Sequence, residues 1–295
     1  MMKIKSLVYF ISILAVVFTI LTSFTLKTSV NTKKYLSVEK AIKAGLIEAK
    51  IVSKGGHTGY CMVAKLKSRC AKDTFIYFEA GRRLKSVDST KQDILITQDQ
   101  PITLFSGEEK TVNIYGFCCQ SHRGSPVVGG KFEVGKMADT PLVLIAQFCN
   151  KKRKLPANVV QNAVWTISDN HSLASVHNDD MEEINELRNY IAQLKGIQLT
   201  WYTLTYQKDN SLLFSNKPEK LFGEIKYYLP NNTYATLAVF DSRGNIMNVV
   251  FEDVPHNPDT YNYAFSLDVS DFPKGKYYIR LFDGVQKKLE KVFEL

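Results

Sequence analysis

Alternation of apolar and polar residues dominates the first half of the chain beyond residue 55. In residues 111–117, Val112 and Ile114 face one side and Asn113 and Tyr115 the other, as the two-residue period of a β-strand requires. Turn residues separate five runs of this kind at the spacing typical of a β-sandwich. The runs are residues 61–66, 74–79, 93–97, 102–105 and 111–117. The pattern therefore predicts a β-sandwich.

Other segments show the period of three to four residues that is typical of a helix. They are residues 141–150, 157–168 and 178–195. The last is the clearest, because acidic residues fill its first turn and Gly196 follows its end. A short helix is also predicted over residues 37–49, with Ser37 as its N-terminal cap.

Short strands separated by turns return in the last third of the chain. We therefore predict a mainly β protein of two domains: residues 37–198 form a β-sandwich with added helices, and residues 199–295 form a second β-sandwich.

The first 30 residues have the pattern of a targeting segment. Lys3 and Lys5 precede residues 7–24, which carry no charge and are mostly apolar. This length lies between a long signal-peptide core and a short membrane-spanning helix. We predict that residues 1–30 are a signal peptide or a signal anchor, and that the protein is exported to the periplasm, the outer surface or the extracellular space.

Charge narrows the choice of partners. The chain has 38 Lys and Arg against 29 Asp and Glu, a formal net charge of +9. The one local basic run, residues 151–154, has no aromatic residues among its lysines and arginine, so it does not favour nucleic acid. A solvated loop is the simpler interpretation. A basic exported protein is attracted instead to anionic envelope polymers and lipid headgroups.

The C-terminal region carries turn motifs at characteristic spacings. A strand ends at Leu229-Pro230, the turn 241–244 ends in Gly244, and the segment 272–281 reads FPKGKYYIRL. With these spacings residues 223–295 resemble the small Ig-like domain of flagellar hook-capping proteins and of type IX secretion sorting domains. The resemblance implies an Ig-like β-sandwich, and either a sorting role through the type IX secretion machinery or a module retained on the mature protein.

A second resemblance concerns the first domain. Residues 160–165 read VQNAVW, and Tyr60-Cys61 stands upstream. Together they resemble the paired motifs of bacterial thioester domains, which are adhesin modules. The resemblance implies a bond between the Cys61 sulfur and the Gln161 side chain, formed when the thiolate attacks the amide carbon and ammonia leaves. The alternative is that Gln161 is an ordinary polar helix residue and that Trp165 anchors the helix on the sheet.

Five cysteines lie in the first half of the mature chain. They are Cys61, Cys70, Cys118, Cys119 and Cys149. An exported protein can form disulfides, but an odd number leaves one thiol over. The segment 118–122 (CCQSH) lacks a convincing fourth zinc ligand. As a nucleophile pair, Cys118 or Cys119 with His122 lacks an orienting residue, and neighbouring residues of a strand face opposite sides. We expect disulfides or buried thiols and no metal site.

These observations favour a non-catalytic role in binding or assembly, without a cofactor, with a protein or a surface glycan as the partner. A covalent adhesin using Cys61 and Gln161 is the leading alternative. A cysteine-dependent enzyme is the third reading.

Overall fold

The computed structural model describes residues 35–178, 182–208 and 213–295. Residues 1–34 are not among them, so the predicted signal peptide or signal anchor lies outside the described residues. Among the helices that are described, none is both long enough and apolar enough to span a membrane.

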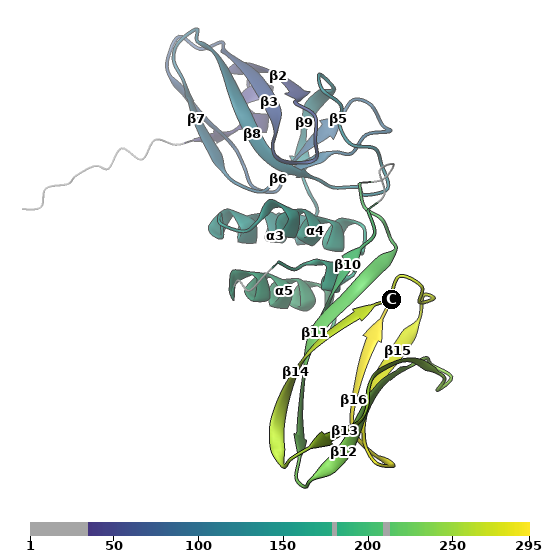
Figure 1. The fold of residues 1–295 in the computed structure, drawn as a ribbon. Helices are drawn as coiled ribbons and strands as arrows, with labels where there is room; N and C mark the ends of the chain where they lie inside the picture. Colours follow the sequence, from purple (N-terminus) through teal and green to yellow (C-terminus); the bar gives the residue numbers. More distant parts are fainter. Residues whose placement is uncertain (1–34, 179–181, 209–212) are drawn as a thin grey trace, which may run out of the picture. The chain divides into compact units, whose positions relative to one another are not determined.

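Six antiparallel strands close into a barrel in the N-terminal half (Figure 1). In barrel order they are β2 (Ile47–Ser53), β3 (Thr58–Ser68), β8 (Glu109–Cys118), β6 (Ile94–Ile96), β5 (Arg82–Ser86) and β9 (Lys131–Met137). Inward residues of these strands, such as Met62, Leu84 and Ile114, are fully buried. The barrel is closed by a short pairing of Ile51 and Val52 with Phe132 and Lys131.

A small sheet packs beside the barrel. It consists of β1 (Leu36–Ser37), β4 (Thr74–Phe78) and β7 (Gln100–Leu104). The helix α2 (Val38–Lys43) follows β1, and the Ser37 side chain accepts a hydrogen bond from the Lys40 N–H. The predicted cap is therefore confirmed.

Helices pack against one end of the barrel (Figure 1). They are α3 (Thr140–Lys151), α4 (Ala157–Ser168), the 3₁₀ turn η1 (Leu173–Ser175) and α5 (Glu182–Lys195). Their apolar faces share a hydrophobic cluster with Leu95, Phe117 and Cys119 of the barrel. The periodicity predicted α3 and α4 to within one residue at each end.

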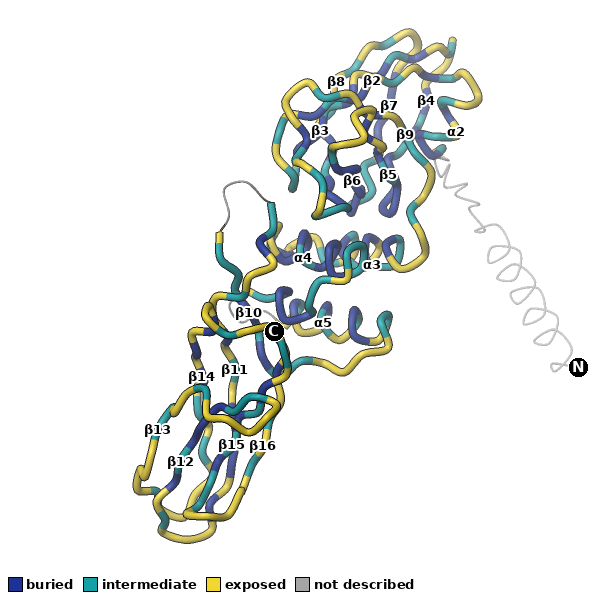
Figure 2. Tube along the Cα trace, turned by 90° about the vertical axis from the view of Figure 1, so that its right-hand side faces the viewer, coloured by how far each residue is buried: buried dark blue, intermediate teal, exposed yellow. Residues whose placement is uncertain are grey.

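The C-terminal region is a sandwich of two antiparallel sheets. One contains β10 (Tyr202–Tyr206), β11 (Pro218–Leu229) and β14 (Asp259–Asp268). The other contains β13 (Ile246–His256), β12 (Thr233–Phe240), β15 (Lys276–Asp283) and β16 (Gln286–Glu294). Buried aliphatic and aromatic side chains fill the space between them, and Figure 2 shows buried positions along β11, β12, β14 and β15, whereas none of the described residues of β13 is buried. Among the described residues, seven strands in two antiparallel sheets form a β-sandwich, as predicted. The fourth strand, β13, pairs with β12, whereas in the constant-type immunoglobulin arrangement the fourth strand lies in the sheet of the first, second and fifth strands.

The predicted mainly β class is confirmed, with two differences of detail. The N-terminal strands close into a barrel where two packed sheets were expected. The predicted helix over residues 37–49 is wrong beyond Lys43, because Gly45 adopts a positive φ of 69° and the chain enters β2 at Ile47. Ile47 and Ile51 are then buried inside the barrel, and this burial outweighs local helix propensity.

Candidate functional site

Helix α4 contributes to two different environments. Gln161 and Trp165, one turn apart, are 2% and 3% exposed and lie against the end of the barrel. Asn158 and Asn162, also one turn apart, line a pocket on another side of the same helix. One side of the helix therefore forms a buried contact with the barrel, through Gln161 and Trp165, and another side lines a solvent-accessible cavity.

The Gln161 amide binds the backbone of the barrel strand β8. Its Oε1 accepts a hydrogen bond from the Cys118 N–H at 3.1 Å, and its Nε2 donates to the Cys118 carbonyl at 2.8 Å. The side chain thus continues the hydrogen bonding of β8 beyond Phe117, beside the point where the neighbouring strand β3 begins at Thr58. An amide that satisfies a buried N–H and a buried C=O in this way stabilises the packing of helix on barrel.

Cys61 approaches the same edge of β8. A bulge in the β3–β8 pairing between Gly59 and Met62 contains Cys61, and its Sγ lies 3.6 Å from the Gly116 carbonyl oxygen. Gly116 and Cys118 are two residues apart, which is about 7 Å along a strand. Cys61 and Gln161 therefore contact backbone groups of β8 that are two residues apart, at Gly116 and Cys118, but Cys61 is a free thiol. Burial raises the pKa of this thiol to about 11.

The other four cysteines are also free, so the structure does not support the predicted disulfides. Cys118 belongs to the barrel core and Cys119 to the cluster under the helices, as the alternation of a strand predicts. Burial raises the pKa of the Cys118 thiol, and it raises the pKa values of Cys119 and Cys149 to about 12. Such thiols are protonated at neutral pH and are poor nucleophiles.

Two histidines have partners that the sequence alone did not reveal. The His122 Nδ1 lies 3.0 Å from Asp169 Oδ1, which supplies the orienting carboxylate that the sequence lacked. His171 Nε2 lies 2.8 Å from Ser121 Oγ. Burial lowers the pKa of His171 to about 4, so this imidazole is neutral and a weak general base at pH 7.

Neither pair has the parts of a nucleophilic site. His122 is exposed, whereas the Cys118 and Cys119 thiols are buried in the two cores. His171 stacks on Phe214 with ring centroids 4.0 Å apart, and its Nδ1 has no hydrogen-bond partner among the described residues. A triad would require an acid at that nitrogen. The described residues also contain no group of three or more His, Cys, Asp and Glu side chains able to hold a metal ion.

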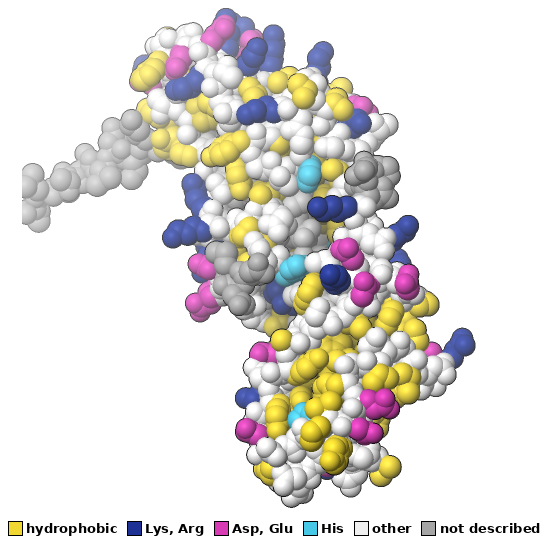
Figure 3. Space-filling model, viewed as in Figure 1, with side chains coloured by type: hydrophobic (Ala, Val, Ile, Leu, Met, Phe, Trp, Pro, Cys, Tyr) yellow, Lys and Arg dark blue, Asp and Glu magenta, His cyan; other side chains and the backbone are white. Residues whose placement is uncertain are grey.

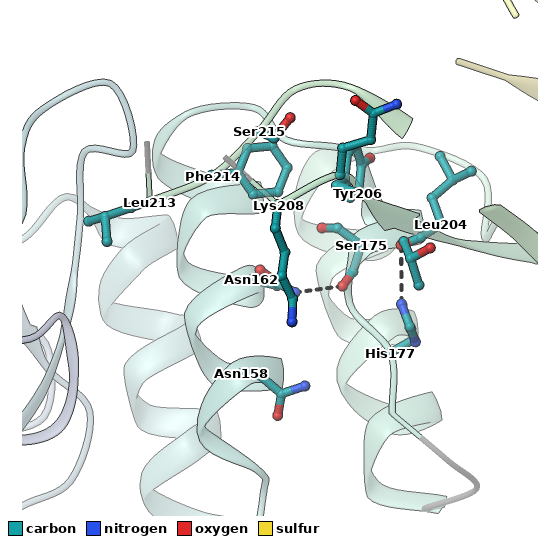
Figure 4. A pocket seen from close by; sticks show the side chains of 12 residues that line it. Asn158, Asn162, Ser175, His177, Leu204, Tyr206, Lys208, Leu213, Phe214 and Ser215 are labelled. Carbon is teal, nitrogen blue, oxygen red and sulfur yellow. Dashed lines mark hydrogen bonds between the residues drawn. The ribbon is translucent and has the colours of Figure 1, made fainter. Parts of the chain in front are cut away.

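The cavity beside α4 has a volume of about 560 Å³, within the range of about 300–1,000 Å³ that ligand pockets occupy. Figure 4 shows Lys208 extending across it toward the asparagines of α4. Its lining combines residues of α4, η1, β10 and the segments beside β10. They are Asn158, Asn162, Ser175, His177, Leu204, Thr205, Tyr206, Gln207, Lys208, Leu213, Phe214 and Ser215.

Internal hydrogen bonds fix part of this lining. Asn162 Nδ2 donates to the Ser175 carbonyl at 2.8 Å, and His177 Nε2 lies 3.1 Å from the Leu204 carbonyl oxygen (Figure 4). These contacts join α4, η1 and β10 around the cavity. The pocket wall is therefore held by both the helical layer and the first strand of the C-terminal sandwich.

A cluster of aromatic side chains extends from the pocket to the contact between α4 and the barrel. The Phe214 ring lies 4.8 Å from Tyr206, 4.0 Å from His171 and 5.9 Å from Trp165, centroid to centroid. Trp165 in turn stacks on His57 at 6.1 Å. No pattern in the sequence pointed to Lys208 or Phe214, which lie outside every predicted helix. The spacing of Asn158 and Asn162 on a predicted helix was the one available signal.

No known protein family and no curated protein matches the sequence. Among solved structures, the chain is similar to the CBM51-2 and INT domains of ZmpB from Clostridium perfringens. The identity is 9%, the match covers 84% of this chain and 77% of that chain, and the TM-score is 0.18. These values do not establish a shared fold.

Proposed function

We propose that this protein is an exported, non-catalytic binding or assembly protein, and that the pocket between α4 and β10 is its binding site. The proposal is carried by the difference in exposure between two sets of side chains. Hydrogen-bonding side chains line an accessible pocket, whereas the thiols that a covalent or catalytic role would use are mostly buried.

The pocket has the composition of a recognition site. Convergent polar groups set orientation, and aromatic or aliphatic side chains supply contact area. Asn158 and Gln207 bring amide groups, while Phe214 and Leu213 bring apolar surface. Among the described residues, the Asn158 side chain has no protein hydrogen-bond partner, so its donors and acceptor are available to a ligand.

The proposed export rests on the sequence of residues 1–30, a basic start followed by an uncharged apolar run. The type IX secretion machinery is the proposed partner of the C-terminal sandwich if residues 223–295 serve as a sorting signal. The sandwich is otherwise a retained module, and the mass of the mature protein distinguishes the two.

A binding screen with paired variants tests this function. Glycans and envelope proteins are presented to the purified mature protein, to Cys61→Ala and to Asn158→Ala. We expect Cys61→Ala to bind as the unaltered protein does and Asn158→Ala to bind at least about tenfold more weakly, the loss of one or two hydrogen bonds. Asn189→Ala, an exposed position on α5, is the matched control. Loss of binding in Cys61→Ala alone would contradict the proposal.

A covalent adhesin is the second candidate, and one observation favours it. Cys61 and Gln161 meet the same edge of β8 at neighbouring positions. In the reaction the Cys61 sulfur would bond to the Gln161 amide carbon, the carbon–nitrogen bond would break, and ammonia would leave with the thiol proton. The bond requires that Gln161 release the Cys118 backbone, and loss of ammonia distinguishes this candidate from the first.

A further inference from the structure

We infer that the pocket between α4 and β10 takes an acidic saccharide, a sugar ring that carries a carboxylate. The inference rests on the proposed function and names the ligand class of that same site. Three properties of the lining carry it: the sign of its charge, the placement of its amides and its aromatic wall.

The first property is charge. No Asp or Glu is among the described residues that line the pocket, whereas Lys208 is. The Lys208 side chain is exposed and extends across the cavity toward Asn158 and Asn162 (Figure 4). An ammonium in this position forms a charge-assisted hydrogen bond with a carboxylate, which is about twice as strong as a neutral one. The excess of Lys and Arg over Asp and Glu, which remains beyond residue 30, attracts an anionic polymer over a longer range.

The second property is the pair of amides on α4. Asn158 and Asn162 are one turn apart, so their side chains lie on the same side of the helix. Asn162 uses its Nδ2 on the Ser175 carbonyl, which leaves its Oδ1 as an acceptor. Asn158 retains both donor and acceptor capacity. This combination suits adjacent hydroxyl groups of a sugar, since each hydroxyl both donates and accepts.

The third property is the ring of Phe214. It is partly exposed at the pocket and is supported by Tyr206 and His171. An aromatic ring has a negatively polarised face, and the C–H groups on one side of a sugar ring are positively polarised. A sugar can therefore stack on Phe214 while its hydroxyls face the amides and its carboxylate faces Lys208.

Calorimetric titration of the mature protein tests the inference. The probes are an oligogalacturonate, a neutral dextran oligosaccharide of the same length, and inorganic polyphosphate as a polyanion without sugar. We expect the oligogalacturonate to bind at least about tenfold more tightly than either control, which is the ratio that one charge-assisted hydrogen bond supports. Lys208→Met should remove that preference, and Phe214→Ala should weaken binding of both saccharides.

Lys226→Met, an exposed position on β11 away from the pocket, is the control for charge and should leave affinity unchanged. Unaltered thermal unfolding of each variant confirms that it is folded. Equal binding of both saccharides would overturn the acidic specificity and leave the proposed function standing. If polyphosphate bound as tightly as the oligogalacturonate, the pocket would attract any polyanion, and the inference of an acidic saccharide would be overturned. Absence of saccharide binding would also overturn it, whereas a different ligand that is lost in Asn158→Ala would still support the proposed function.

Discussion

The barrel with its helices and the C-terminal sandwich have different interiors. Most buried polar residues of the described chain belong to the first region, among them Arg82, Gln92, Asp93 and Gln161, whereas Ser215 is the one buried polar residue after residue 198. The sandwich core consists of aliphatic and aromatic side chains, and hydrophobic side chains also gather on its surface (Figure 3). The first region therefore buries polar groups beside two hydrophobic clusters, whereas the interior of the sandwich is almost entirely apolar.

The difference indicates which region holds polar side chains in fixed positions for ligand recognition. The end of the barrel is organised by polar contacts: the Asp93 carboxylate accepts hydrogen bonds from the Ser86 N–H, Arg83 and Gln120. Such a network fixes the positions of the groups around it. Helix α4 is docked on this rigid end and presents its asparagines to the pocket. The sandwich contributes the opposite wall through β10.

The largest effect is expected at Arg82, whose side chain is 3% exposed and donates to Glu39, Glu79 and the Gly135 carbonyl. Arg82→Met keeps much of the volume but leaves two carboxylates without their partner, which costs about 3–5 kcal/mol in the free energy of unfolding. Denaturant unfolding followed by the fluorescence of Trp165, in the barrel region, measures the loss.

The matched change in the sandwich is Arg280→Met, which removes an ion pair with Glu290 that is 25–30% exposed. Such a pair contributes about 0–1 kcal/mol, and Trp201 reports on that region. Equal losses in the two variants would contradict the contrast between the regions.

A smaller loss is expected at Gln161. Gln161→Leu removes both hydrogen bonds to the Cys118 backbone. The Cys118 N–H still donates to the His57 carbonyl at 3.0 Å, so the carbonyl alone loses its partner. Leaving one buried group unpaired costs about 1–3 kcal/mol. Gln161→Met is the control for shape, and it should be destabilised equally. An unchanged unfolding midpoint in both variants would show that the amide has no structural role.

In the sandwich, a trimmed side chain is expected to cost about 1 kcal/mol. Ile279 is fully buried between the sheets, and Ile279→Val removes one methylene and leaves every hydrogen bond in place. The change is measured from the denaturant midpoint reported by Trp201. A loss as large as that of Arg82→Met would mean that the sandwich core tolerates substitution no better than the polar network does.

The smallest effect is expected from acid pH. Hydrogen bonds from Lys43 and Arg82 lower the pKa of Glu39 from 4.5 to about 2. Because the folded state holds the lower pKa, this stabilisation is present above pH 4.5 and is lost as pH falls toward 2. Unfolding curves at pH 6 and pH 3 should therefore differ less for Glu39→Gln than for the unaltered protein. The same difference in both proteins would contradict this assignment.

The sequence predicted most helices and strands of the first domain, but it did not predict that the strands close into a barrel. Period-two and helical patterns located β3, β4, β6, β7, β8, α3, α4 and α5, because burial of one face is a local property of the sequence. Strands β2, β5 and β9 were missed. Arg82 and Gly135 interrupt the apolar pattern of β5 and β9, and barrel closure depends on pairing between residues such as Ile51 and Phe132, which are distant in sequence.

The candidate site was predictable only in part. The resemblance to thioester domains identified Cys61 and Gln161, which the structure brings to one strand edge. It did not indicate that Gln161 binds the Cys118 backbone, because that contact depends on where β3 begins beside β8. The pairs Ser121–His171 and His122–Asp169 join a turn to the residues after α4. Only the packing of α4 on the barrel brings them together.

We propose that this protein binds its partner without a covalent bond, and its intact mass is the sharpest test of that proposal. The purified mature protein is denatured without reductant and measured before and after exposure to methylamine. We expect a mass equal to that of the unmodified mature chain with five free thiols, unchanged by methylamine. A mass short by one ammonia that gains the mass of methylamine on exposure, and that is not seen in Cys61→Ala, would rule out non-covalent binding alone and establish the thioester adhesin.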